Sequence, residues 1–125
     1  MAWRATIVAP EIDPKIIEIE LDALVRANRY LLLRHRVPPL YKSGVHYQAE
    51  TPPKEDWLTA PVAAQLGLAD CEDLACWRAA ELQMAGERAR PVYKREQVGG
   101  YGFWHIQVER ENGDIEDPSR LLGMK

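Results

Sequence analysis

Apolar residues recur with helical spacing over residues 68–86, and small or apolar side chains cover most of the circumference of this segment. Asp70 is suited to cap the N-terminus of the helix, because a carboxylate there can accept hydrogen bonds from the first backbone N–H groups. Gly86 is suited to end it, because glycine readily adopts the left-handed conformation that follows many helices. The pattern predicts a central helix that packs against neighbours on several sides.

The rest of the chain predicts one long helix before this segment and a group of strands after it. A stripe of leucines with helical spacing runs through residues 16–36, and two prolines then end it. Residues 89–95 and 102–110 read as strands, and Asn112–Gly113 is typical of a tight turn between antiparallel strands. A β-prone run at residues 3–8, an irregular or short extended segment at residues 40–50 and a short helix at residues 61–66 complete the prediction. Helices followed by antiparallel strands indicate an α+β fold.

Composition fits a single globular domain of 125 residues, of which 46% are hydrophobic and 28% are charged. The formal net charge of −3 disfavours nucleic acid as the main partner. No cationic leader opens the chain and no apolar stretch approaches the length of a membrane span. We therefore expect no membrane partner, and a location in the cytoplasm or in a virion assembled there.

The first candidate for chemistry is Cys71, which lies in the opening turn of the predicted central helix. Unpaired N–H groups and the helix dipole favour the reactive thiolate at such a position. The neighbouring Glu72 and Asp73 oppose this effect, so a cationic partner would be needed. The alternative interpretation is that Cys71 is a small buried hydrophobic residue, as we expect for Cys76.

Two further candidates lie on the predicted strands. Pairing across the turn would place Asp117 opposite residue 107 or 108, about one strand step from His105, where side chains can meet diagonally. Asp114 competes with Asp117, but it lies three residues away and hence on the other strand face. The arrangement lets Asp117 orient His105 and lets His105 reach Cys71, which is the logic of a thiol triad.

These residues also carry a resemblance to a known family. The run Asp-Cys-Glu-Asp-Leu-Ala at residues 70–75, Leu-Gln-Met-Ala-Gly at 82–86, the strand histidine and Glu-Asp-Pro-Ser at 116–119 resemble the transglutaminase-like branch of the papain-like cysteine peptidases. Trp-Leu-Thr-Ala-Pro at residues 57–61 is most similar to the bacterial transglutaminase-like cysteine proteinases. Two departures are Ala69, where the relatives usually have glycine, and an N-terminal half that matches none of the periplasmic members.

The resemblance implies one transglutaminase-like domain over residues 1–125. Residues 1–50 would supply an N-terminal strand and helix, and residues 55–120 would form a papain-like catalytic core. In this core the helix that carries the cysteine packs on a small antiparallel sheet.

The resemblance makes Cys71 the nucleophile, His105 the general base and acid, and Asp117 the orienting carboxylate. Cys71 would attack an amide or ester carbonyl, and water or an amine would resolve the thioacyl enzyme. The backbone N–H of Cys71 would be the first donor to the oxyanion. Gln65 resembles, by its spacing, the second donor of papain, while Tyr47 and Trp57 are rival donors.

Trp57, Tyr47 and Trp104 are expected to line a groove for a protein or peptide substrate, although packing within the fold explains such aromatic residues equally well. Asp70 and Glu72 match the calcium ligands of some relatives, but a helix cap and a first-turn charge explain both residues. No other cofactor is expected.

Two functions follow from this pattern. The first is a small thiol hydrolase, a protease or amidase, similar to the single-domain members found in phage and prophage gene sets. The second is a catalytically silent structural or adaptor protein, for example with a structural partner in a phage particle.

Overall fold

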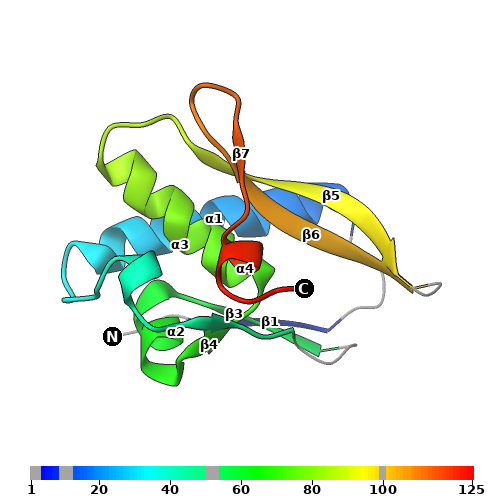
Figure 1. Cartoon of the computed structure of the whole chain (residues 1–125), viewed down its shortest axis with the longest axis horizontal. Coiled ribbons are helices and arrows are strands. Elements are labelled where there is room, and N and C mark those ends of the chain that lie inside the picture. Colours follow the sequence, from blue (N-terminus) through cyan, green and yellow to red (C-terminus); the bar gives the residue numbers. More distant parts are fainter. Residues whose placement is uncertain (1–3, 9–12, 50–53, 99–100) are drawn as a thin grey trace.

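The computed structural model describes residues 4–8, 13–49, 54–98 and 101–125. Helices and strands alternate irregularly along these residues (Figure 1). In chain order they are β1 (Arg4–Val8), α1 (Pro14–Leu32), the 3-10 turn η1 (Leu40–Lys42), β2 (His46–Tyr47), β3 (Lys54–Leu58), α2 (Ala60–Leu66), β4 (Leu68–Ala69), α3 (Cys71–Met84), β5 (Arg90–Val98), β6 (Tyr101–Glu109), β7 (Ile115–Glu116) and α4 (Pro118–Leu121). Within these residues, no helix has the length and apolar character that a membrane crossing requires.

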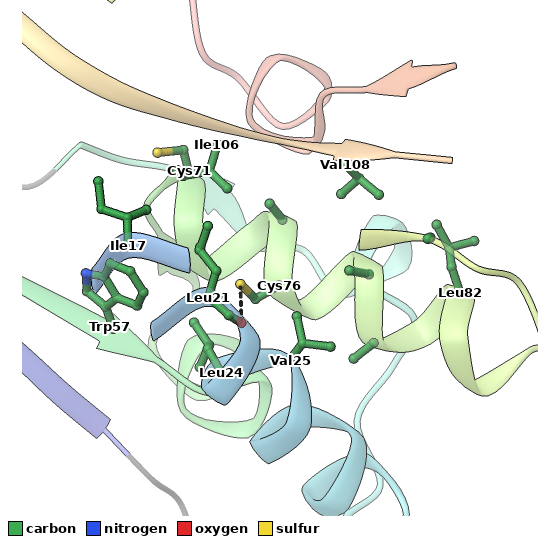
Figure 2. Close-up of a cluster of buried hydrophobic side chains, with 14 residues drawn as sticks. Ile17, Leu21, Leu24, Val25, Trp57, Cys71, Cys76, Leu82, Ile106 and Val108 are labelled. Atoms are coloured by element: carbon green, nitrogen blue, oxygen red, sulfur yellow. Dashed lines mark hydrogen bonds between the residues drawn. The ribbon is translucent and has the colours of Figure 1, made fainter. Parts of the chain in front are cut away.

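Helix α3 lies at the centre and contacts α1 on one side and strands β5 and β6 on the other (Figures 1 and 2). Its buried residues come from nearly every side of the helix, which confirms the expectation that it packs in several directions. Two hydrophobic clusters meet on it. The first joins α1, α3 and β6, and the second joins η1, α2 and the Trp77 face of α3. The structure therefore mixes helix and sheet around one central helix.

The N-terminus of α3 is fixed by its cap, as the sequence predicts. Asp70 accepts a hydrogen bond from the backbone N–H of Cys71 at 2.7 Å, and Asp73 accepts one in return from the N–H of Asp70 at 3.1 Å. Asp73 also accepts the N–H of Leu58 at 2.6 Å, which ties strand β3 to the helix. Because these bonds satisfy buried donors, they set the position of Cys71 at the first turn.

The sheet next to α3 contains β5, β6 and β7 in that order, and both pairings are antiparallel. The turn predicted at Asn112–Gly113 joins β6 to β7, and Gly113 has a φ of 93°, a conformation that suits glycine. Val108 pairs with Glu116. Continued by one residue, this register places Asp117 opposite Gln107, within the range that the sequence predicts.

The remaining elements differ from expectation where pairing is long-range. Helix α1 ends at Leu32, short of the expected residue 36. Strand β1 lies within the β-prone run at residues 3–8, but its partner β3 has no predicted strand character. Within residues 40–50, where an irregular or a short extended segment is expected, His46–Tyr47 form the extended strand β2, which pairs in parallel with β4. Residues 68–69, expected in the central helix, belong to β4, because this pairing holds them in an extended conformation.

Candidate functional site

The thiol of Cys71 lies against the edge of strand β6. Its Sγ lies 3.7 Å from the carbonyl oxygen of Trp104 and 3.4 Å from Glu72 Oε2, two acceptors for the single thiol proton. The backbone N–H of Ile106 also interacts with the sulfur, and Figure 2 shows Cys71 beside Ile106 at the start of α3. The strand that carries His105 therefore contacts the sulfur through the residues on either side of the histidine. Cys71 itself is only 6% exposed.

The surroundings of this thiol favour its neutral form. Burial raises the pKa of Cys71 well above its ordinary value, and the nearby carboxylates of Glu72 and Asp70 raise it further. The N–H of Ile106 acts in the opposite direction but does not outweigh them. The cationic partner expected from the sequence is absent from the thiol's hydrogen bonds within the described part of the chain. The helix dipole alone thus leaves a thiol rather than a thiolate.

His105 and Asp117 form a close pair. His105 Nε2 lies 2.8 Å from Asp117 Oδ2, and the histidine is completely buried. Asp117 is the N-cap of α4, where it accepts the backbone N–H of Arg120 at 3.3 Å. Burial raises the pKa of Asp117, but hydrogen bonds from His105 and Gln107 outweigh it and hold the pKa below its usual value. The carboxylate is therefore ionised and able to orient the ring.

The second ring nitrogen of His105 is available as a base. Because Nε2 faces a carboxylate, we assign the proton to Nε2, which leaves a lone pair on Nδ1. Nδ1 is buried and has no hydrogen-bond partner within the described residues. No hydrogen bond in this part of the chain joins Nδ1 to the Cys71 sulfur, whose partners are Glu72 and the Trp104 carbonyl. The cysteine therefore contacts the backbone of the strand that carries the histidine, but its thiol lies against a carboxylate rather than the imidazole.

The expected oxyanion donors are placed less favourably. The backbone N–H of Cys71 already donates to Asp70. Gln65 is exposed near the C-terminal end of α2, and no hydrogen bond within the described residues connects it to Cys71. Tyr47 on β2 is partly buried, and its pKa is raised by burial and then by the charges of Asp70, Cys71 and Glu72. Its hydroxyl therefore remains protonated and can act as a donor beside the thiol.

The three aromatic residues expected in a substrate groove have different environments. Trp57 is 2% exposed and belongs to the core cluster of α1 and α3, because β3 turns it inward. Trp104 is partly exposed and packs edge-on against Tyr93 at 5.4 Å between ring centroids. Tyr47 also keeps partial exposure. Tyr47 and Trp104 are thus the two that present surface outside the core.

The candidate cation ligands gather at the helix start. Ligand atoms of Asp70, Cys71 and Glu72 lie within 4.8 Å of one another, and all three residues are buried. Two carboxylates are suitable calcium ligands, but they supply only part of the six to eight oxygens that calcium takes. One of them is also engaged as the cap of α3. The residues fit a calcium shell in part, and calcium remains a prediction from the resemblance.

Sequence reasoning missed two residues that contact Asp117. Gln107 Nε2 donates to Asp117 Oδ2 at 3.1 Å, and Arg120 Nε lies 3.3 Å from the same oxygen. The available signal was the position of Gln107 two residues after His105, since alternate residues of a strand share one face.

Comparisons of this chain with protein-family models, with curated proteins and with solved structures gave no match. Function therefore has to be inferred from the residues of the site and their geometry.

Proposed function

We propose that this protein is a small thiol hydrolase with a papain-like core, acting on an amide or ester bond of a protein or peptide. The observation that carries the proposal is the His105–Asp117 pair, 2.8 Å apart, with the Nδ1 of His105 available on the strand that the Cys71 sulfur contacts. An oriented imidazole beside a cysteine at a helix N-terminus is the arrangement that activates a thiol nucleophile.

The chemistry would proceed in two halves. His105 Nδ1 accepts the thiol proton, and the sulfur of Cys71 forms a bond to the substrate carbonyl carbon. When the tetrahedral intermediate collapses, the carbon–nitrogen or carbon–oxygen bond breaks and His105 returns the proton to the leaving group. Water then attacks the thioester carbonyl carbon while His105 takes a proton from it. The carbon–sulfur bond breaks, the acid leaves, and His105 returns the proton to the sulfur, which restores the Cys71 thiol.

A first step must precede this cycle in the structure described. The Cys71 thiol donates to Glu72 at 3.4 Å, so it has to exchange that partner for the imidazole. Rotation about the side-chain bond of Cys71 between staggered positions provides such a movement.

A second candidate function is supported by a different observation. The thiol is nearly buried, its pKa is raised and the adjacent N–H is already bonded to Asp70. These features suit a structural or adaptor protein, such as a component of a phage particle, that keeps the fold and binds a partner. In that case Cys71 acts as a packing residue.

Thiol reactivity and turnover separate the two candidates. We expect the wild-type protein to hydrolyse p-nitrophenyl esters or a panel of peptide amides. Cys71→Ala and His105→Asn should abolish turnover, while Cys76→Ala and His46→Asn, matched changes outside the site, retain it. Iodoacetamide should label Cys71 faster than Cys76, and the labelling should slow in His105→Asn. Absence of turnover, together with labelling that does not depend on His105, would favour the structural protein.

A further inference from the structure

A half-buried glutamine, Gln107, donates its side-chain N–H to the carboxylate that orients His105. Gln107 Nε2 lies 3.1 Å from Asp117 Oδ2, and His105 Nε2 lies 2.8 Å from the same oxygen. His105 and Gln107 are two residues apart on β6 and therefore project from the same face of the sheet. The register places Asp117 directly opposite Gln107 and diagonal to His105.

A charged group also forms an ion pair with the same oxygen. Arg120 Nε lies 3.3 Å from Asp117 Oδ2, and the Arg120 side chain is 50% exposed. Asp117 is also the cap of the four-residue helix α4. Arg120, on the same short helix, is therefore a charged partner of the carboxylate that competes with the imidazole of His105. The contacts from β6, made by His105 and Gln107, hold the same oxygen on the side of the ring.

Gln107 supplies its contact without adding charge. A carboxylate oxygen has two acceptor positions, so the amide N–H and the imidazole N–H can share one oxygen. An amide is neutral, so, unlike the Arg120 guanidinium, it does not offset the negative charge of Asp117 that stabilises an imidazolium. A cation in the same place would reduce this stabilisation.

We propose that Gln107 is a positioning residue that holds the Asp117 carboxylate toward His105 and so sets the rate of the proposed hydrolysis. The role rests on the proposed function, although the geometry that Gln107 imposes on the pair is measurable without turnover. Gln107 acts through Asp117 and need not touch the substrate.

Kinetics of two variants test the role. Gln107→Ala removes the donor, and Gln107→Glu keeps the shape while replacing the donor with an acceptor. In each we expect kcat to fall roughly tenfold with KM nearly unchanged, which is the size of loss seen when a residue that orients a functional side chain by a hydrogen bond is replaced. In Gln107→Ala the acid limb of the kcat–pH profile should move to lower pH, because a displaced carboxylate stabilises the imidazolium less. A rise in KM at unchanged kcat, or a kcat within twofold of the parent, would overturn the proposal.

The matched control is Gln83→Glu. The Gln83 amide also donates a hydrogen bond, to the Ala89 carbonyl oxygen at 2.8 Å, and it lies on α3 rather than at the pair. It should leave kcat and the pH profile unchanged. Urea denaturation of all three variants shows whether a lost rate reflects lost folding instead.

A nuclear magnetic resonance measurement separates failure of this role from failure of the hydrolase proposal. The Nε2 proton of His105 should resonate downfield in the parent because it is bonded to a carboxylate. It should shift upfield and exchange faster in Gln107→Ala. An unchanged resonance would refute the positioning role even in an active enzyme. A changed resonance in a protein without turnover would support the positioning role of Gln107 and refute the proposed hydrolase function.

Discussion

Glu72→Gln should make the Cys71 thiol more reactive. The Glu72 carboxylate accepts the thiol hydrogen bond at 3.4 Å and is, after burial, the first cause of the raised pKa of Cys71. Glutamine keeps nearly the same shape and an oxygen acceptor, but it removes the negative charge. The variant therefore changes the electrostatic environment of the sulfur and conserves its packing.

The size of the effect follows from the distance. Two unit charges 3.4 Å apart repel by about 5 kcal/mol at an effective dielectric constant of about 20, and by about 1 kcal/mol in bulk water. Removing the charge should therefore lower the pKa of Cys71 and raise the fraction of thiolate at neutral pH. More thiolate forms, but each thiolate is less nucleophilic, so the alkylation rate at neutral pH should rise roughly 3- to 50-fold.

The assay is iodoacetamide labelling in a Cys76→Ala background, followed by intact-protein mass spectrometry over a range of pH. Asp70→Asn is the matched control, because asparagine also caps helices while the variant removes the more weakly acting charge. It should accelerate labelling less than Glu72→Gln. Equal labelling rates in the parent and in Glu72→Gln would show that the charge of Glu72 does not limit the reactivity of Cys71. Burial of the thiol would then explain its low reactivity.

Three further predictions concern the fold. Leu24→Ala, at a fully buried position, should lower the free energy of unfolding in urea by about 2–5 kcal/mol. Leu33→Ala, at a site 73% exposed, should change it by less than about 0.5 kcal/mol. Similar losses in the two variants would contradict the placement of Leu24 in the core. Asn28→Ala removes the buried acceptor that lies 2.7 Å from the first N–H of α2 and should cost about 1–3 kcal/mol. Faster hydrogen exchange of that N–H should accompany the loss, and an unchanged exchange rate would contradict it. Hydrogen bonds from Arg110 lower the pKa of Glu87 to about 2. The stability that these bonds give is therefore fully present at a pH above the ordinary pKa of a glutamate, and it is lost as the pH falls toward 2. Arg110→Gln should therefore lose less stability than the parent between about pH 5 and about pH 2.5, and equal losses would show that the pair does not contribute.

Local patterns were sufficient to predict the start of α3 and the turn between β6 and β7. A cap at Asp70 and an Asn-Gly pair act over a few residues, so the sequence shows them directly. The turn also brought Asp117 close to His105, because antiparallel register follows from the turn. The part of the candidate site that depends on neighbouring residues was therefore predictable.

Long-range pairing and side-chain orientation were not predictable in the same way. Strand β3 pairs with β1, about fifty residues earlier in the chain, and this pairing turns Trp57 into the core. The sequence is equally compatible with Glu72 as a first-turn charge and as a partner of the thiol, because it does not determine the side-chain conformation of Glu72. The turn predicts that residue 107 or 108 lies opposite Asp117, but the hydrogen bond from the Gln107 amide to that carboxylate depends on side-chain orientation.

Helix α3 contributes residues to both hydrophobic clusters: Ala75 and Ala79 belong to one, and Leu74 and Trp77 to the other. Neither cluster can come apart without exposing a face of the same helix. Unfolding should therefore occur as one cooperative transition, and the amide hydrogens of α3 should be the last to exchange with solvent.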